Sequence, residues 1–373
     1  MVCRVKEAEK QAETAAVREA LVAWFRRGHR DMPWRKTRDP YAIWISEIML
    51  QQTRVETVTP YFQRWMQRFP SVSKLAAAPL DDVLTHWAGL GYYARARNLH
   101  AAAREIETTY GGRFPSDTEA VHALPGIGPY TAGAILSIAF GKAEPILDGN
   151  VMRVLSRVYR IEGAVDDTAF KKKLWALAAR LVPSEAAGDF NQAMMELGAM
   201  VCSVRAPGCS QCPLAALCAA QAAGVQEDYP APKKKTALKA VEQVTVLVEK
   251  EGRVLLVRRP PAGLWGGLWE PPTGERARGE DADKAAARVL RATTGLALTH
   301  LAELDQFEHV LTHRRMRFFA FRARPRGRVK LDGYDASQWL PVKDAAALGV
   351  SAWTTRVLAK LSQEQPRDDR EPA

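Results

Sequence analysis

The sequence predicts a two-domain protein, with an all-α domain followed by an α+β domain. From Val17 to Ala220 the apolar residues recur mostly at helical spacing, and prolines and glycines interrupt the pattern where helices would end. The next segment, Glu227 to Ala240, has two prolines and three successive lysines, as interdomain linkers often do. Beyond it the apolar period changes to two, which is typical of strands. The chain of 373 residues is long enough for both domains.

We therefore place the helical domain at 1–226, the linker at 227–240 and the α+β domain at 241–365, with 366–373 as a disordered tail. Within the second domain the pattern predicts four elements. They are a hairpin of Val241 to Val248 and Val254 to Val257 around the turn KEGR, a helix from Asp283 to Thr294 that Gly295 ends, a strand in MRFFAFRAR, and a terminal helix near Trp353 to Leu361.

The charge balance favours a polyanionic partner. Lysine and arginine number 53 against 42 acidic residues, a net charge of +11, which attracts nucleic acid through phosphate neutralisation. Eight basic residues and no acidic one lie between Arg314 and Lys330. No apolar stretch approaches the roughly 18 residues that span a bilayer, and the N-terminus is too charged for a signal peptide. We expect a cytoplasmic, nucleoid-associated protein that does not bind membranes.

One carboxylate, Glu47, lies inside the apolar run of WISEIMLQQT. Burial among such neighbours raises the pKa of a carboxyl group, by up to about 3 to 5 units, so Glu47 can stay protonated at neutral pH. A second carboxylate, Asp148, stands directly before the amphipathic run GNVMRVLSR, where a helix N-cap belongs. If Asp148 only caps this helix, it needs no further role. Two carboxylates in different environments can, however, divide acid and base roles between them.

The segment 116–141 predicts a helix, a tight hairpin and a second helix. Ser116 with Glu119 forms a capping box, Pro125-Gly126-Ile127-Gly128 forms the turn, and Pro129 opens the second helix. Gly126 and Gly128 let the backbone approach a ligand, and the free amides after them suit a phosphate of DNA. An ordinary turn between two helices explains the pattern equally well.

Four of the five cysteines fall within seventeen residues, 202–218, with the spacing C-x6-C-x2-C-x5-C. In an intracellular protein such a cluster indicates metal ligation before disulfides. The spacing provides ligands for one zinc ion or one [4Fe-4S] cluster and does not choose between them. The candidate ligands are Cys202, Cys209, Cys212 and Cys218.

Several motifs together resemble the helix-hairpin-helix DNA glycosylase superfamily, and within it the adenine DNA glycosylases of the MutY family. These motifs are SEIMLQQT, GLGYYARARNL, LPGIGPYTAGAI, LDGNVMRV and the spaced cysteines, in collinear order from about Trp24 to Cys218. The resemblance implies a helical glycosylase domain with a [4Fe-4S] cluster. It also implies a monomer that hydrolyses adenine mispaired with 8-oxoguanine or guanine in double-stranded DNA. Protein partners stay open.

The resemblance assigns Glu47 as the acid that protonates adenine N7 and Asp148 as the anion that stabilises the sugar cation, with Asn150 nearby. Tyr130 stands where strand-cleaving relatives have a Schiff-base lysine, so we expect a monofunctional hydrolase. It further implies an adenine pocket and residues that enter the DNA helix. The pocket residues are Arg30, Trp34, Leu50 and Gln192, and the DNA-contacting residues are Gln51, Gln52 and Tyr92. From the residues alone, Trp34 and Leu50 fit a hydrophobic core equally well.

The segment Gly274 to Leu296 resembles a Nudix box that has lost its metal ligands. Val289, Ala292 and Thr293 stand at its glutamate positions, and magnesium needs oxygen ligands there, so we expect no Nudix hydrolysis. The domain instead resembles the lesion-recognition module of the MutY family. There a Phe-Ser-His loop reads 8-oxoguanine, and this chain has Leu311, Thr312 and His313. Leucine replaces the aromatic residue.

Two other functions stay open at this point. One is a related glycosylase with another base preference, of the endonuclease III or thymine-mismatch type, against which the Nudix-like domain argues. The other is a non-catalytic protein that binds damaged DNA. A protein of that kind would be expected to lose at least one of the two carboxylates, whereas Glu47 and Asp148 are both present.

Overall fold

The computed structural model describes residues 2–233, 237–345 and 347–364, and the side chains of residues 2–10 are not described. The chain divides into two compact units, Met1–Ala76 with Ala101–Lys235 and Ala77–His100 with Thr236–Ala373. The predicted all-α then α+β order is confirmed, while the predicted domain boundaries stay a prediction. The predicted tail, 366–373, and residues 234–236 of the predicted linker lie outside the described residues.

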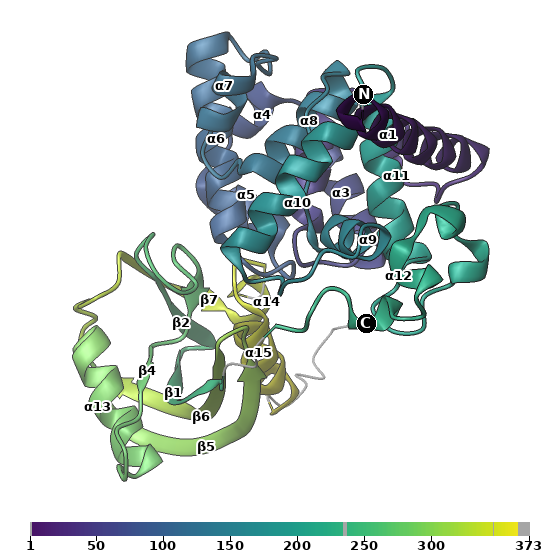
Figure 1. The fold of residues 1–373 in the computed structure, drawn as a ribbon. Helices are drawn as coiled ribbons and strands as arrows, with labels where there is room; N and C mark the ends of the chain where they lie inside the picture. Colours follow the sequence, from purple (N-terminus) through teal and green to yellow (C-terminus); the bar gives the residue numbers. More distant parts are fainter. Residues whose placement is uncertain (1, 234–236, 346, 365–373) are drawn as a thin grey trace, which may run out of the picture. The chain divides into compact units, whose positions relative to one another are not determined.

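The first unit is helical (Figure 1). Asp39, Asp148 and Asp167 each cap the N-terminus of a helix by accepting backbone N–H groups with the side chain. The α-helices are α1 (Val2–Arg27), α2 (Pro40–Leu50), α3 (Val55–Arg68), α4 (Val72–Ala77), α6 (Ala94–Tyr110), α7 (Thr118–Ala123), α8 (Pro129–Phe140), α9 (Gly149–Val158), α10 (Thr168–Leu181), α11 (Ala187–Met200) and α12 (Ala219–Ala222), with 3-10 turns η1 (Pro33–Arg35), η2 (Cys209–Gln211), η3 (Ala215–Leu217) and η4 (Gln226–Asp228).

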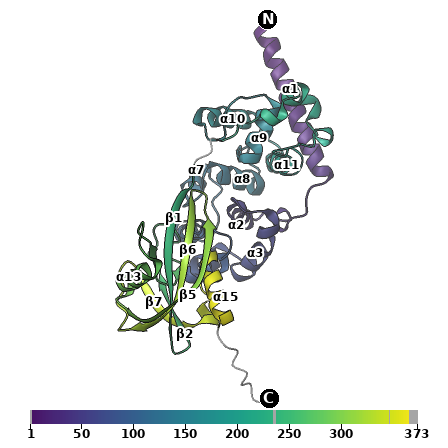
Figure 2. The same cartoon turned by 90° about the horizontal axis from the view of Figure 1, so that it is seen from below.

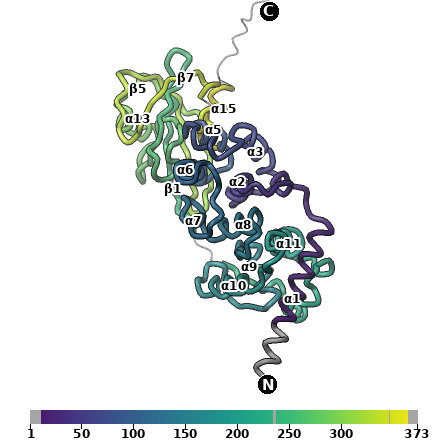
Figure 3. Tube along the Cα trace, turned by 90° about the horizontal axis from the view of Figure 1, so that it is seen from above, coloured from purple at the N-terminus to yellow at the C-terminus, as the bar shows by residue number. Residues whose placement is uncertain are grey.

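Two apolar helices, α2 and α8, pack against each other inside the first unit. Residues 41–49 of α2 and residues 131–137 of α8 are all buried, because both helices are apolar around most of their circumference. A second core joins α1, α9, α10 and α11, and Figure 3 shows α1 alongside α11. The site residues of α2, α8, α9 and α11 are therefore held by packed helices and not by loops.

The predicted helix-hairpin-helix is formed by α7 and α8, but its predicted capping box is wrong. Asp117, and not Ser116, caps α7 by accepting the Ala120 N–H at 2.9 Å, so the helix begins one residue later than expected. Aspartate caps as well as serine does, and the sequence offered both. Pro129 opens α8 as predicted, and Gly126 has φ of 76°, a conformation that glycine adopts without strain.

The second unit contains a seven-stranded sheet in the order β3-β2-β1-β6-β5, with β4 paired to β1 and β7 to β2. The predicted hairpin is confirmed, since Glu249 pairs with Val254 across the turn. The β1 and β6 strands are parallel, and the other pairs are antiparallel. The strands are β1 (Lys239–Lys250), β2 (Arg253–Arg258), β3 (Trp269–Glu270), β4 (Thr273–Glu275), β5 (Ala297–Val310), β6 (Arg314–Arg326) and β7 (Ala336–Pro341).

Helices cover both faces of this sheet (Figure 2). One face packs against α13 (Ala282–Thr294), which ends at Gly295 as predicted. The other face packs against α15 (Ala352–Glu364), which follows the short α14 (Val342–Ala345). The alternation along β6 explains this, because Phe318 belongs to the α15 core and its neighbour Phe319 to the α13 core.

The segment 77–100, which contains α5 (Leu80–Trp87), packs with the sheet residues of the second unit. Tyr93 donates its hydroxyl proton to the Val350 carbonyl at 2.9 Å, and Arg97 donates to the Gly266 carbonyl at 2.6 Å. The helical periodicity of this segment did not reveal its partner. Among the described residues, no helix is long and apolar enough to cross a membrane.

Candidate active site

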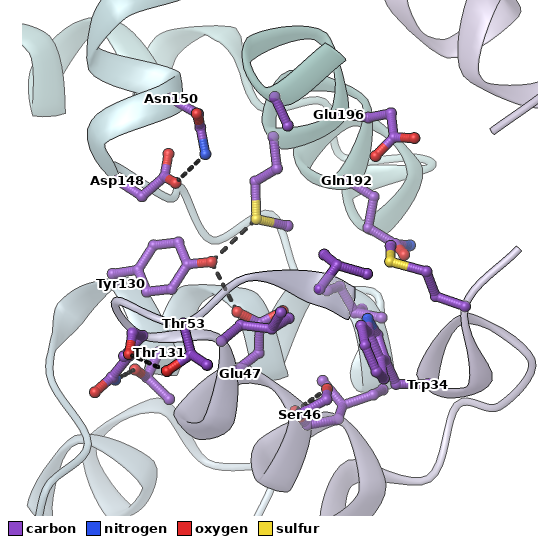
Figure 4. Close-up of a pocket in the computed structure, with 18 of the residues that line it drawn as sticks. Trp34, Ser46, Glu47, Thr53, Tyr130, Thr131, Asp148, Asn150, Gln192 and Glu196 are labelled. Atoms are coloured by element: carbon purple, nitrogen blue, oxygen red, sulfur yellow. Dashed lines mark hydrogen bonds between the residues drawn. The ribbon is translucent and has the colours of Figure 1, made fainter. Parts of the chain in front are cut away.

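The first unit contains a cavity of about 880 Å³ between α2, α8, α9 and α11. Twelve of the predicted residues line it, although they come from segments more than 160 residues apart in the sequence. Figure 4 labels several of them. They are Arg30, Trp34, Glu47, Leu50, Gln51, Gln52, Tyr130, Asp148, Asn150 and Gln192, and the hairpin glycines Gly126 and Gly128 line it as well.

Glu47 lies in the buried middle of α2, where its side chain reaches the cavity. The Tyr130 hydroxyl donates to Glu47 Oε2 at 2.7 Å. Burial raises the pKa of Glu47 to about 7; the Asp148 charge adds to the rise, while the Tyr130 hydrogen bond and the Arg35 charge oppose it. This is the upward shift that the apolar sequence around Glu47 predicts. Glu47 is therefore poised to carry and release a proton near neutral pH.

Asp148 has two tasks in the structure. As the N-cap of α9 it accepts the Val151 N–H at 2.7 Å, and its other oxygen accepts the Asn150 amide at 2.9 Å. Burial raises the pKa of Asp148, and these hydrogen bonds oppose the rise because they favour the ionised form. Figure 4 shows Tyr130 between Glu47 and the pair of Asp148 and Asn150. The cap thus also aims a carboxylate at the cavity.

A chain of hydrogen bonds connects Asp148 to the cysteine-rich loop. Asn150 accepts Arg153 Nη2 at 2.9 Å through Oδ1, and the same guanidinium donates to the carbonyls of Gly198 and Cys202, both at 2.7 Å. Arg153 therefore fixes the orientation of the Asn150 amide, which in turn holds Asp148. The sequence did not reveal this role.

Replacing Arg153 with methionine is expected to disturb both stability and the site. The carbonyls of Gly149, Gly198 and Cys202 and the Asn150 amide oxygen lose this donor, which costs about 1–3 kcal/mol of unfolding free energy if they stay unsatisfied. Adenine release should slow as well, because Asn150 is free to turn away from Asp148. Thermal melting and single-turnover kinetics measure the two effects. Arg160→Met, an exposed site two residues after α9, is the control, and an equal effect of both changes would contradict the role of Arg153.

A buried carboxylate, Glu196, organises the opposite wall of the cavity. It accepts both Arg30 Nε and Nη2 and also Arg35 Nη2, the last at 2.9 Å. Burial alone would raise its pKa, but the hydrogen bonds from Arg30 and Arg35 outweigh this and lower the pKa of Glu196 to about 2. The sequence analysis missed Glu196 and Arg35. The signal was present, because Glu196 interrupts the apolar run AMMELGAM as Glu47 interrupts its own.

The predicted DNA-contacting residues of this unit lie at the rim of the same cavity. Gln51 ends α2 and donates to the Thr131 hydroxyl at 3.2 Å, and Gln52 follows with φ of 58°. Gly128 has open space where a Cβ would be, so the backbone at the start of α8 is accessible. The N–H groups of the first turn of α8 are available for an anion such as a phosphate.

The four predicted metal ligands line one further pocket, next to α9 and α11. Arg157 is buried there and donates to Cys202 Sγ at 3.3 Å and to the Ser203 carbonyl at 2.6 Å. The four thiols and a buried cation beside them fit the donor set of a thiolate-bound iron–sulfur cluster. Within the part of the chain that the structure describes, no three ligand side chains are close enough to share a single metal ion.

The remaining predicted residues lie in the second unit. The Tyr92 hydroxyl and Thr312 Oγ1 are 2.6 Å apart, and both residues are exposed. His313 is exposed too, in the turn between β5 and β6. Leu311 packs partly against the α15 core, so the residue at the aromatic position of the loop points inward. The structure thus brings Tyr92 and Thr312 together from positions 220 residues apart.

The segment that resembles a Nudix box, Gly274 to Leu296, contains α13 and the residues on both sides of it. Arg288 pairs with Glu280 at 2.8 Å. Val289, which belongs to α13, is buried in the core between this helix and the sheet. A valine in the core offers no metal ligand. The pairing of Arg288 and Glu280 therefore has a structural role here.

The fold and the site define a DNA glycosylase of the helix-hairpin-helix class. Residues 45–180 match the family described as "HhH-GPD superfamily base excision DNA repair protein", and residues 243–360 match the family "NUDIX domain". A solved structure titled as a thermostable thymine-DNA glycosylase is 30% identical, with a TM-score of 0.52 over 57% of this chain and 99% of that one.

Two curated relatives that match over longer parts of the chain are more specific. The adenine DNA glycosylase of Homo sapiens is 35% identical, covering 95% of this chain and 76% of the human protein. That of Buchnera aphidicola subsp. Acyrthosiphon pisum (strain APS) is 40% identical over 67% of this chain and 72% of its own length. The chain belongs to the adenine DNA glycosylase family.

Proposed function

We propose that the protein is a base-excision-repair hydrolase that removes adenine mispaired with 8-oxoguanine or guanine in duplex DNA. The observation that carries the proposal is the placement of Glu47, with its pKa near 7, on the same cavity as Asp148. The family supports adenine as the excised base. The net charge of +11 supports binding to DNA.

The chemistry follows from the two carboxyl groups. Adenine is a poor leaving group until it is protonated, and the sugar that it leaves becomes an oxocarbenium-like cation. Protonated Glu47 supplies the proton to N7, and the bond between sugar and base breaks with its electron pair going to adenine. Ionised Asp148, held by Asn150, stabilises the cation until water adds to it. Apolar burial suits Glu47 to carry the proton, and hydrogen bonds favour the ionised form of Asp148. The two carboxyl groups therefore have different roles.

Tyr130 cannot form the Schiff base through which strand-cleaving relatives act, because a phenol has no amine. It lies where the strand-cleaving relatives carry a lysine, and its hydroxyl is held by Glu47. Burial and the nearby charge of Glu47 raise the pKa of Tyr130 well above its ordinary value, so the hydroxyl stays protonated. Among the residues that line the cavity there is no lysine. The product is therefore an abasic site in an intact strand.

Adenine must leave the DNA helix to reach Glu47. Arg30, Trp34, Leu50 and Gln192 surround the space for the base, where Glu196 fixes Arg30. Gln51 and Gln52 lie at the rim and are suited to fill the gap in the stack, while the backbone around Gly126 and Gly128 binds a phosphate. Tyr92, which belongs to the second unit and is half exposed, is the aromatic side chain suited to enter the DNA helix.

Thr312, together with His313, reads the base opposite adenine. Thr312→Val removes the hydroxyl beside Tyr92 and is expected to lower activity opposite 8-oxoguanine by up to about tenfold, the worth of one hydrogen bond. Activity opposite guanine should change less. Single-turnover rates on both duplexes give the ratio, and Thr299→Val, whose hydroxyl is exposed on β5, is the control. An unchanged ratio would remove Thr312 from lesion reading.

Cys202, Cys209, Cys212 and Cys218 hold a [4Fe-4S] cluster in this proposal. The cluster would stiffen the loop that Arg153 and Arg157 fasten to α9, and it takes no part in the chemistry. Purified protein should show the broad visible absorption of such a cluster, which zinc lacks. Cys209→Ser should lose this absorption and have a lower melting temperature. A colourless wild-type protein that contains zinc would show that the four cysteines bind zinc and not a cluster.

The decisive test of the function is adenine release in a single turnover. Four duplexes are compared, with adenine opposite 8-oxoguanine, adenine opposite guanine, thymine opposite guanine, and an adenine–thymine control. We expect release from the first two alone. Thymine release would identify a thymine-mismatch glycosylase, which the similarity to a thymine-DNA glycosylase makes the second candidate. Binding to the mispairs without release of any base would identify a damage-binding protein.

A further inference from the structure

The Tyr130 hydroxyl has two acceptors and one proton. Besides Glu47 Oε2 at 2.7 Å, it lies 3.0 Å from the sulfur of Met195, which projects from α11 into the same cavity. Figure 4 draws both contacts as dashed lines from Tyr130. A hydroxyl group donates one hydrogen bond and accepts up to two. Tyr130 therefore cannot donate to Glu47 and to Met195 at the same time.

The two protonation states of Glu47 allow different partners for the Tyr130 hydroxyl. An ionised carboxylate only accepts, so Tyr130 donates to it. A protonated carboxyl group can donate to the Tyr130 oxygen, and the Tyr130 proton then needs another acceptor. The thioether of Met195 is a weak acceptor in the required place. Without it, a Tyr130 hydroxyl that accepts from protonated Glu47 would lose the acceptor that Met195 provides.

We propose that Met195 is a positioning residue for the catalytic acid: its sulfur accepts the Tyr130 hydrogen bond when protonated Glu47 donates to the Tyr130 oxygen. The inference rests on the proposed function, in which Glu47 is the acid. It assigns a chemical task to a methionine that would otherwise count as cavity lining. Met195 touches neither the base nor the sugar in this role and acts through Tyr130.

The charged and titratable groups that face Glu47 come from four elements. Tyr130 belongs to α8, Asp148 caps α9 and Arg35 ends η1. On α11 the acidic neighbour is Glu196, which is already bound to Arg30 and Arg35. Replacing Met195 changes none of these charges. A change in the titration of Glu47 would therefore report the acceptor itself.

The same sulfur is a site for oxidation, because it lines an open cavity. Hydrogen peroxide transfers one oxygen atom to the thioether: the O–O bond breaks, sulfur loses two electrons and water is released. The sulfoxide oxygen accepts a hydrogen bond more strongly than the thioether sulfur. It would compete with ionised Glu47 for the Tyr130 hydrogen bond and so raise the pKa of Glu47, which should extend the protonated, active form of Glu47 to higher pH.

Two substitutions test the role in opposite directions. Met195→Leu removes the acceptor and should lower the pH at which Glu47 ionises, by about half a unit to one unit, the size of one hydrogen bond. Met195→Gln offers a stronger acceptor and should raise it. The readout is the pH dependence of the protonated carboxyl C=O stretch that Glu47→Gln removes, measured on the cluster-containing protein without DNA. This readout does not depend on glycosylase activity, so it separates a failure of this inference from a failure of the proposed function.

Peroxide treatment provides the second arm. Mass spectrometry locates the added oxygen, and the visible absorption confirms that the cluster is intact. In treated wild type the pH at which Glu47 ionises should shift upward, as in Met195→Gln, and the pH at which the single-turnover rate falls should shift with it. In Met195→Leu, which has no sulfur at this position, peroxide treatment should leave the ionisation of Glu47 and the single-turnover rate unchanged. Met200→Leu removes a 54% exposed methionine at the end of the same helix and should respond as wild type does. If Glu47 titrates identically in all variants, or both substitutions shift it the same way, Met195 only packs and the inference is wrong.

Discussion

Glu47→Gln should reduce adenine release by about 10²- to 10⁴-fold, the usual contribution of general acid catalysis. Glutamine keeps the size of the side chain and can still accept the Tyr130 hydrogen bond, but it has no proton to give to adenine N7. Single-turnover kinetics on adenine opposite 8-oxoguanine measure the loss. Affinity for the same duplex should be retained, because Glu47 is buried in α2 and the substitution leaves the exposed surface that would meet the DNA backbone unchanged.

The matched control is Glu56→Gln, which removes a negative charge from the exposed rim of the same cavity. We expect it to change the rate by less than about threefold, as for surface substitutions in general. Equal losses in both variants would show that the cavity needs negative charge and not an acid at Glu47. An unchanged rate in Glu47→Gln would exclude the mechanism proposed here.

The raised pKa of Glu47 also predicts a pH dependence. Protonated Glu47 is the active form, so the rate should fall as pH rises through about 7. The folded state binds this proton more tightly than the unfolded state, so stability is lost as pH rises from about 4.5 to about 7. Glu47→Gln removes the loss, and at pH 8 it should be more stable than wild type by up to about 3 kcal/mol.

Glu196→Ala should be the most destabilising single substitution in the site, by about 3–5 kcal/mol, because it leaves a buried cation without a partner. The Arg35 side chain is 7% exposed and Glu196 is 3% exposed, so water does not compensate the lost charge. Arg30 loses its partner as well, and with it the wall of the adenine pocket. Urea unfolding measures the stability, and adenine release should fall more than unfolding explains.

A double-mutant cycle provides the control for Glu196. If the charge pair is the cause, Glu196→Ala with Arg35→Met should be less destabilising than the two single effects combined. Strict additivity would contradict this explanation. The pKa of Glu196 is lowered to about 2, so its contribution is complete above about pH 4.5 and is lost as pH falls toward 2. The difference between wild type and Glu196→Ala should shrink over that range.

Local sequence patterns predicted those structural elements that a few adjacent residues are sufficient to specify. The hairpin of β1 and β2, the helix α13 with its glycine stop, and the Asp148 cap each depend on a few adjacent residues. The capping box at Ser116 was wrong for the same reason, since two good caps stood side by side and the sequence did not choose between them. The raised pKa of Glu47 was predicted from its apolar neighbours alone, whereas Glu196, which also interrupts an apolar run, was not singled out.

The sequence by itself determined the order of the domains, the two carboxylates and the four cysteines, because spacing and alternation along the chain specify helices, strands and ligand sets. Only the tertiary structure decided which residues share a site. It placed Arg35 and Glu196 together on the cavity, gave the Tyr130 hydroxyl two acceptors, and grouped the segment 77–100 with the sheet. Such contacts join residues far apart in the chain, and they depend on the packing of whole helices, which no local pattern encodes.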